Sequence, residues 1–245
     1  MAKVQIMNTS HNYSSNEQKP TERQQYGAFI QRVIRHFQLN PNVPVRFADI
    51  ADCDKRRQSD LYNILNALEI FGHLNDKFIT WKGFGATTSA LIRMGIRNEV
   101  LSHTQNMCSI FNVGTSPPLG ILTMTFLQMF VYLGLPSLNI QEAVIIMASS
   151  ADQVKKILRR LYLIVFILIQ VGLLEHGNEH SLYILIQPLD LIISTIFQET
   201  LRLKMFPHGT IEELLNRLDA NYLKNLHQRR LEEYRTSLNR FNNQK

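Results

Sequence analysis

The chain has 245 residues, enough for two small domains, and 45% of them are hydrophobic, so that each domain can build a core. Its formal net charge is +6 and its isoelectric point is about 9.4, which favours anionic partners, with nucleic acid first among them. Two cysteines, Cys53 and Cys108, cannot form a disulfide framework. Because the N-terminus carries no signal-peptide pattern, we expect an intracellular protein with reduced thiols.

The sequence carries no pattern that is typical of an enzyme or of a metal site. It has no glycine-rich phosphate loop, no nucleophile motif and no Cys/His cluster with zinc spacing, so we expect no cofactor, metal or small-molecule substrate. The segment Leu161 to Leu174 is almost wholly apolar. At about 14 residues, it falls short of the roughly 18 to 20 that span a bilayer, and it therefore predicts a buried core helix rather than a membrane segment.

The first part of the chain is predicted to fold as three helices followed by a hairpin. Apolar residues recur at spacings of three and four from Tyr26 to Phe37, which predicts a helix with one buried face. Asp54 is the expected N-cap of the third helix. The predicted segments are a disordered tail over 1–20, a first helix from Thr21 to the break at Asn40, a second helix over Val45–Ala51, a third helix over Asp54–Phe71, and strands at Leu74 and over Phe78–Trp81 with a turn at Asn75-Asp76.

The second part repeats this order after a segment of mixed character. Phe84 to Ser116 is predicted to be a linker that carries a helix near Ser89 to Leu101. The predicted segments that follow are a helix over Leu119–Leu133, a break at Gly134-Leu135-Pro136, a helix over Asn139–Ala148, a basic helix over Ala151–Val171, a hairpin over Leu173–Gln187, and two C-terminal helices over Leu189–Lys245 that are split at Pro207-His208-Gly209. We therefore expect domains at 21–83 and 117–187, a linker at 84–116 and C-terminal helices at 188–245.

One segment appears twice in variant form, about 100 residues apart. Each copy is a basic helix start, then an apolar helix, then a hairpin. The first copy begins at Lys55-Arg56-Arg57 and closes with Ile79 to Gly83, and the second begins at Lys155-Lys156 and closes with Ser181 to Gln187. This order predicts a mainly α protein with small β wings, in which two tandem winged-helix (helix-turn-helix) domains form an intramolecular pseudo-dimer. The third helix of a winged helix enters a DNA major groove.

These residues resemble the E-two-F/DP family of winged-helix transcription factors, whose signature is R-R-x-Y-D, then N-V-L-E, then I-x-W-x-G. The resemblance covers roughly residues 22–187, and two such domains in one chain resemble the atypical subfamily, which binds DNA without a DP partner. It implies a nuclear regulator of transcription that binds a G·C-rich promoter element. The matching residues are Tyr62, Asn66, Leu68, Glu69, Ile79, Trp81 and Gly83 in the first copy, and Arg159, Arg160, Leu161 and Tyr162 in the second.

The two copies depart from the family pattern in different ways. Aligned on Tyr62, the first copy has Ser59-Asp60 where the arginine pair should stand, and its own arginines lie one helical turn earlier. These arginines either supply the cationic contact from a shifted position or merely solvate the helix start. Arginine is the usual bidentate reader of guanine, so the second pair is expected to read bases, with an ordinary cationic helix surface as the alternative. The predicted DNA-binding residues are Arg56, Arg57, Tyr62, Lys155, Lys156, Arg159, Arg160 and Tyr162.

Leu163, Phe166 and Ile167 make the second basic helix apolar on more than one side. We interpret them as a contact between the two winged helices, or with partners, and burial by the C-terminal helices is the alternative. The competing function is a non-catalytic winged-helix scaffold subunit of a nuclear complex, with weak or no sequence-specific DNA binding. In both hypotheses we expect protein partners to bind through the C-terminal helices.

Overall fold

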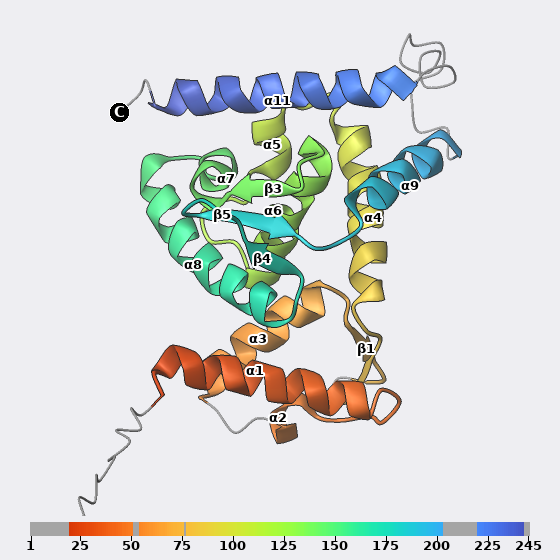
Figure 1. The fold of residues 1–245 in the computed structure, drawn as a ribbon, viewed down its shortest axis with the longest axis vertical. Coiled ribbons are helices and arrows are strands. Elements are labelled where there is room, and N and C mark those ends of the chain that lie inside the picture. The colour runs from red at the N-terminus through yellow and green to blue at the C-terminus, as the bar shows by residue number, and fades with distance from the viewer. Residues whose placement is uncertain (1–19, 51–53, 76, 203–219, 243–245) are drawn as a thin grey trace, which may run out of the picture.

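The computed structural model describes residues 20–50, 54–75, 77–202 and 220–242 (Figure 1). In these ranges the chain is mainly helical and carries two small antiparallel sheets, which confirms the coarse fold class that the sequence predicts. The predicted disordered tail, apart from Pro20, and the predicted break at Pro207-His208-Gly209 lie outside the described residues.

The first half of the chain follows the predicted order of elements. Thr21 caps α1 in a capping box with Gln24, so both side chains satisfy backbone amides at the helix start. The third helix ends four residues earlier than predicted, because Glu69 adopts a φ of 57°, a left-handed conformation that stops the helix and turns the chain into the first strand. The elements are α1 (Glu22–Leu39), α2 (Phe47–Ile50), α3 (Lys55–Ala67), β1 (Phe71–His73) and β2 (Ile79–Trp81).

The segment predicted to be a linker, 84–116, is largely helical. It holds α4 (Gly85–Leu101) and α5 (Met107–Phe111), and the helix expected near Ser89 begins four residues earlier, at Gly85. Leu91 of α4 is fully buried, and the β-carbon of an alanine at Gly95 would clash with Ile196. Residues 84–116 are therefore packed into the structure along most of their length.

The second half matches the predicted helices closely. α6 (Leu119–Leu133) has the predicted bounds, and Gly134 ends it with a φ of 65°. The remaining elements are β3 (Ser137–Asn139), α7 (Ile140–Met147), α8 (Ala151–Gln170), β4 (Leu174–His176), β5 (Leu182–Leu185) and α9 (Leu189–Arg202). No helix in the described part of the chain is long and apolar enough to cross a membrane.

The two halves are structural repeats of each other, called here the first and the second repeat. In the second repeat the sheet order is β3-β5-β4. In the first repeat Val45 forms an isolated bridge with Ile79 beside the β1-β2 pair, so the same three-stranded order is present in reduced form. Each repeat consists of a helix, a short strand or bridge, two helices, a hairpin and a closing helix, which is α4 in the first repeat and α9 in the second.

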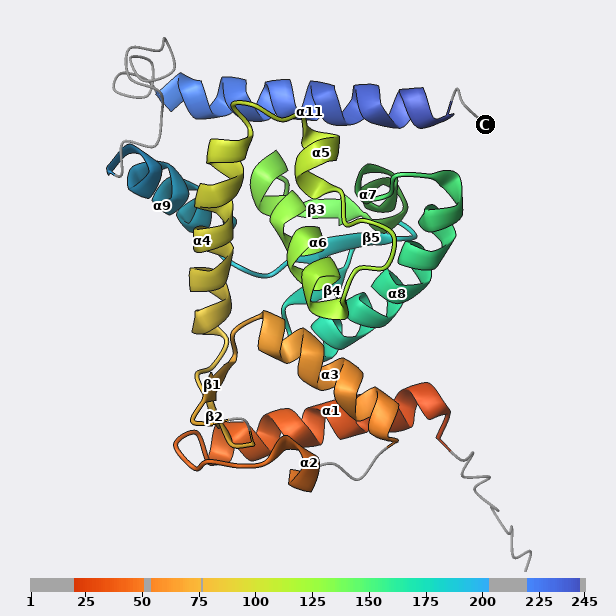
Figure 2. The ribbon, with the colours of Figure 1, turned by 180° about the vertical axis from the view of Figure 1, so that it is seen from behind.

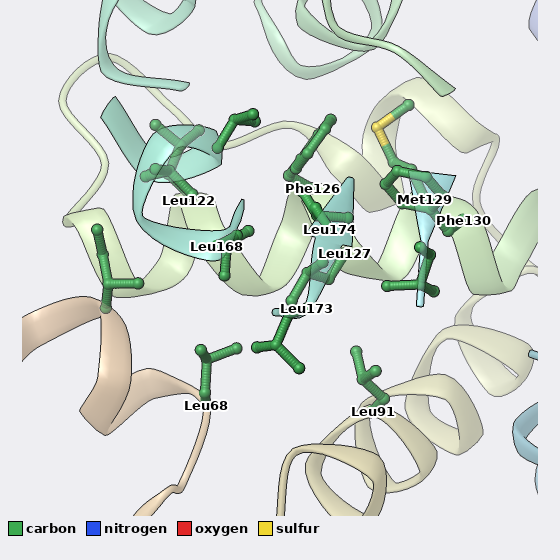
Figure 3. Packing of buried hydrophobic residues seen from close by; sticks show 14 of the residues in the cluster. Leu68, Leu91, Leu122, Phe126, Leu127, Met129, Phe130, Leu168, Leu173 and Leu174 are labelled. Carbon is green, nitrogen blue, oxygen red and sulfur yellow. The ribbon is translucent and has the colours of Figure 1, made fainter. Parts of the chain in front are cut away.

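One continuous hydrophobic core joins both repeats. Figure 3 shows Leu68 and Leu91, from the first repeat, beside Leu173 and the α6 side chains of the second. α4 also packs against α9, its counterpart in the other repeat. The repeats are therefore held against one another by apolar packing and are not separate domains joined by a flexible segment.

The last helix, α11 (Ala220–Asn242), lies across α5, α6 and α7, at the end of the molecule opposite to α1 (Figures 1 and 2). Arg230 holds it there, because its guanidinium forms a 2.6 Å ion pair with Glu99 of α4 and donates a 3.1 Å hydrogen bond to the Tyr132 carbonyl of α6. Both charged side chains are buried, with 4% and 8% of the side chain exposed, so each depends on the other for its charge compensation.

Replacing Arg230 with alanine should destabilise the protein by about 3–5 kcal/mol, because it leaves the Glu99 carboxylate buried without its partner. Urea denaturation of the variant gives this free energy of unfolding. Arg229→Ala, on the exposed side of the same helix, is the matched control and should change it by less than about 0.5 kcal/mol. Equal effects of the two substitutions would contradict the assigned role of the Arg230–Glu99 pair.

Candidate nucleic-acid interface

Two of the contacts between the repeats are equivalent to each other. α1 packs on α8 at Gly27, where an added β-carbon would lie 3.2 Å from Gln170 Oε1. α6 packs on α3 at Gly120, where it would lie 2.9 Å from the β-carbon of Ala67. Gly27 meets Gln170 and Phe166, and Gly120 meets Ala67 and Asn63. In both cases the partners are the last residue of the basic helix and the residue four positions before it. The same contact is therefore made twice, as in the isologous interface of a two-fold symmetric dimer.

The structure fixes the register between the two basic helices. A separation of 103 positions relates the last helical residues Ala67 and Gln170, and also the strand starts Phe71 and Leu174. It also relates the two left-handed residues that end the helices, Glu69 and Gly172.

The same separation places Arg56-Arg57 opposite Arg159-Arg160 and Ser59 opposite Tyr162. The alignment on Tyr62 is therefore three positions out of register with the structure. That alignment placed the arginine pair of the first repeat one helical turn too early. In the structure the two arginine pairs occupy equivalent positions on their helices.

Both arginine pairs line one cleft of about 1130 Å³ between the repeats. Its walls come from the start of α1, the start of α3, the middle of α8 and the β4-β5 hairpin, and Figure 1 shows α8 and α1 flanking this side of the molecule. Five arginines and three carboxylates line it, so the cleft carries a positive balance. The charged lining residues are Arg23, Arg56, Arg57, Arg159, Arg160, Glu22, Asp54 and Asp60.

The two members of each pair have different roles in the structure. Arg57 forms a 2.8 Å ion pair with Glu22 and lies over the Tyr26 ring, while Arg160 donates a hydrogen bond to the Pro117 carbonyl just before α6. The second arginine of each pair is thus held by its own repeat.

The first arginine of each pair, Arg56 or Arg159, is exposed. Within the described ranges neither forms an ion pair. Of the four paired arginines, these two have the guanidiniums that are available to an anionic ligand.

Asp60 lies in the cleft among these cations. Burial raises the pKa of its carboxyl above the ordinary value, although the charges of Arg56 and Arg160 oppose that rise. Asp54 adds a smaller upward contribution. The ionised form of Asp60 is therefore disfavoured, and it opposes an incoming anion.

The two tyrosines of the predicted motifs differ. Tyr62 packs in an aromatic cluster with Phe47, at 5.2 Å between ring centroids, and with Phe71, at 5.9 Å. Tyr162 is 39% exposed, and its hydroxyl is 3.3 Å from Ser181 Oγ. Tyr62 therefore contributes to packing, and Tyr162 presents its ring at the surface of the cleft.

Lys155 and Lys156 do not line the cleft, but they extend its cationic wall. Both are exposed on α8, and together with Arg159 and Tyr162 they recur at helical spacing on one face. That face continues to Phe166, where α1 covers it.

The three apolar residues predicted to join the repeats have separate places. Phe166 stacks on Tyr26 of α1, at 6.0 Å between ring centroids, with the Arg23 guanidinium 4.9 Å from its ring. Leu163 lines the cleft, and Ile167 is fully buried in the core. Phe166 thus touches the other repeat directly. The last helix, α11, packs on α5, α6 and α7.

Two features of the site were not predicted from the sequence, namely the glycine contacts between the repeats and the shared cleft. The glycines at the repeat contacts, Gly27 and Gly120, have a weak signal, because each lies within the first helix of a repeat, where alanine is the better helix former. The meeting of both arginine pairs at one cleft has no local signal, since it depends on how the repeats dock.

No protein-family model matches the chain, and no curated protein is similar enough to it to count as a match. Among the residues that the structure describes, no group of three or more His, Cys, Asp or Glu side chains is placed to hold a metal ion.

The two glycine contacts should respond differently to alanine. At Gly120 the new β-carbon meets Ala67 at 2.9 Å and the Asn63 carbonyl at 3.3 Å, so the helices must separate, and we expect a loss of about 1–3 kcal/mol. At Gly27 it meets the flexible end of Gln170, so the better helix propensity of alanine should leave stability unchanged or raised by up to about 1 kcal/mol. Chemical denaturation of both variants measures the difference.

Gly85→Ala serves as the control, because nothing lies within 4 Å of its added β-carbon. If Gly120→Ala were as stable as Gly85→Ala, the close approach of α6 to α3 would be absent in solution.

Proposed function

We propose that this chain is a sequence-specific DNA-binding regulator of transcription, in which two winged helices form an intramolecular pseudo-dimer on a G·C-rich duplex in the nucleus. One observation carries the proposal: two arginine pairs from separate repeats line the same cleft. A single chain would thereby place two equivalent basic helices against one DNA site without a partner subunit.

The architecture of each repeat supports this function. The order of helix, strand, two helices and hairpin is that of a winged helix, and it makes α3 and α8 the third helices, which carry the arginine pairs. In such folds the third helix lies in the major groove. Two equivalent contacts between the repeats give the pseudo-twofold relation that a dimer on DNA would have.

The chemistry of the exposed side chains fits a nucleic acid. Arg159 is free to donate two parallel hydrogen bonds to guanine O6 and N7, the commonest specific contact in the major groove. Lys155 and Lys156 are placed along the same helix face to contact phosphates, which position a protein without reading sequence.

The scaffold function remains the second candidate, on one specific observation. Parts of both basic helices are covered by the other repeat, α8 at Phe166 by α1 and α3 at Ala67 by α6. In that case the cleft would receive a protein segment rather than a duplex.

Arg159→Ala should weaken binding to a G·C-rich duplex by about 5- to 150-fold, because one bidentate contact is worth roughly 1–3 kcal/mol. The duplex is of the type that the resemblance to the E-two-F/DP family implies. Fluorescence anisotropy at about physiological salt, against a scrambled duplex, measures this loss. Arg229→Ala, on α11 at the far end of the molecule, is the control and should bind like the wild type. Equal weak binding of all variants to both duplexes would favour the scaffold function.

Asp60→Asn should tighten DNA binding by about two- to fivefold. Removing one negative charge near the phosphates is worth on the order of 0.5–1 kcal/mol at water-like screening. Because its pKa is raised, wild-type Asp60 should lose its charge, and the protein gain part of this affinity, as the pH falls towards that pKa.

His176 also lines the cleft, so wild type and variant are compared at each pH. Asp190→Asn, exposed at the start of α9, controls for the change in net charge. A loss of affinity in Asp60→Asn would mean that this carboxylate contributes to binding rather than opposing it.

A further inference from the structure

We propose that the two repeats contact DNA in different ways: α8 reads base edges, whereas α3 holds the phosphate backbone. This inference rests on the proposed DNA binding and adds which half of the pseudo-dimer carries sequence information. The preferred target is then a duplex in which one G·C-rich half-site determines specificity, not a duplex with two equivalent half-sites.

The open face of α8 is long and rich in donors. From Ala151 to Tyr162 the helix rises about 18 Å, at 1.5 Å per residue, which exceeds the roughly 12 Å width of the major groove. Lys155, Lys156 and Arg159 project from this stretch and are exposed. α8 can therefore lie in the groove with Arg159 at base-reading distance and a lysine on each side of the same face for the phosphates.

The exposed face of α3 before its arginine pair is shorter than that of α8. α3 begins one residue before Arg56, whereas α8 begins eight residues before Arg159. Arg56 therefore stands in the first turn of its helix, where the helix dipole favours an anion such as a phosphate.

The second half of α3, like the equivalent part of α8, is covered by the other repeat, so only the stretch before this crossing can approach bases. α6 crosses it there, with a β-carbon at Gly120 lying 2.9 Å from that of Ala67. Between this crossing and Arg56, the exposed side chains of Ser59 and Asn63 are short and bonded to each other at 3.3 Å.

After the arginine pair, which both helices carry, α3 differs from α8 at two equivalent positions. Opposite Leu163 stands Asp60, a carboxylate that would face the acceptor-rich groove. Opposite the exposed Tyr162 stands Ser59. The tyrosine of α3, Tyr62, is instead packed against Phe71. Lys55 and Arg56 remain as the long exposed donors at the start of α3, which suits a backbone contact.

The test compares Arg56→Ala and Arg159→Ala in the full chain. Affinities are measured for a G·C-rich duplex and a scrambled duplex over a range of salt concentrations. Arg159→Ala should lower the ratio of specific to scrambled affinity by about 5- to 150-fold. Arg56→Ala should weaken both duplexes alike, keep the ratio, and reduce the slope of log affinity against log salt by about one.

The lysine variants sharpen the comparison, because lysine keeps the charge but loses the bidentate fork. Arg56→Lys should restore wild-type affinity, and Arg159→Lys should not restore the ratio. Both arginines are exposed, so all four variants should unfold at the wild-type denaturant concentration.

A drop in the ratio for Arg56→Ala as large as that for Arg159→Ala would overturn the division of roles, while DNA binding itself would stand. An unchanged ratio for Arg159→Ala would also overturn it. A wild-type chain that binds neither duplex would overturn the proposed function and this inference together.

Discussion

The packing of the two repeats at a pair of equivalent helix contacts determines how the basic helices are oriented. α1 meets α8 at Gly27, and α6 meets α3 at Gly120, where there is no room for a methyl group. Because the two contacts are equivalent, they orient the basic helices about a pseudo-twofold relation and open one shared cleft. The pairing of α4 with α9 and the common core hold that orientation, so the cleft is part of the fold rather than a gap between loosely joined domains.

The charges of the cleft are arranged so that each pair has one fixed and one free arginine. Arg57 and Arg160 are bonded to the start of the first helix of their own repeat, which leaves Arg56 and Arg159 facing outward. The half-buried Asp60 lies between cations of both repeats, and its burial raises the pKa of its carboxyl above the ordinary value. A pre-formed cationic surface of this kind requires little reorganisation on meeting a polyanion.

The second half of the fold was predictable because its signals are local. Apolar periodicity and the Gly134 stop gave the bounds of α6, and α8 ends within one residue of its prediction. The end of α3 was not predictable, since a left-handed glutamate at Glu69 has no strong sequence signal. The alignment on Tyr62 did not show that Arg56 and Arg159 occupy equivalent positions. The register is fixed by the ends of α3 and α8 and by the starts of the strands that follow them. The convergence of both pairs depends on tertiary docking, which no local pattern encodes.

Hydroxyl-radical footprinting of the full chain on a G·C-rich duplex, with the stoichiometry measured in parallel, tests the central claim most directly. If two basic helices of one chain share one DNA surface, a 1:1 complex should protect two neighbouring segments whose centres lie about one helical turn, roughly 10 base pairs, apart. Two chains per footprint, or no protection at about physiological salt, would contradict the intramolecular pseudo-dimer on DNA.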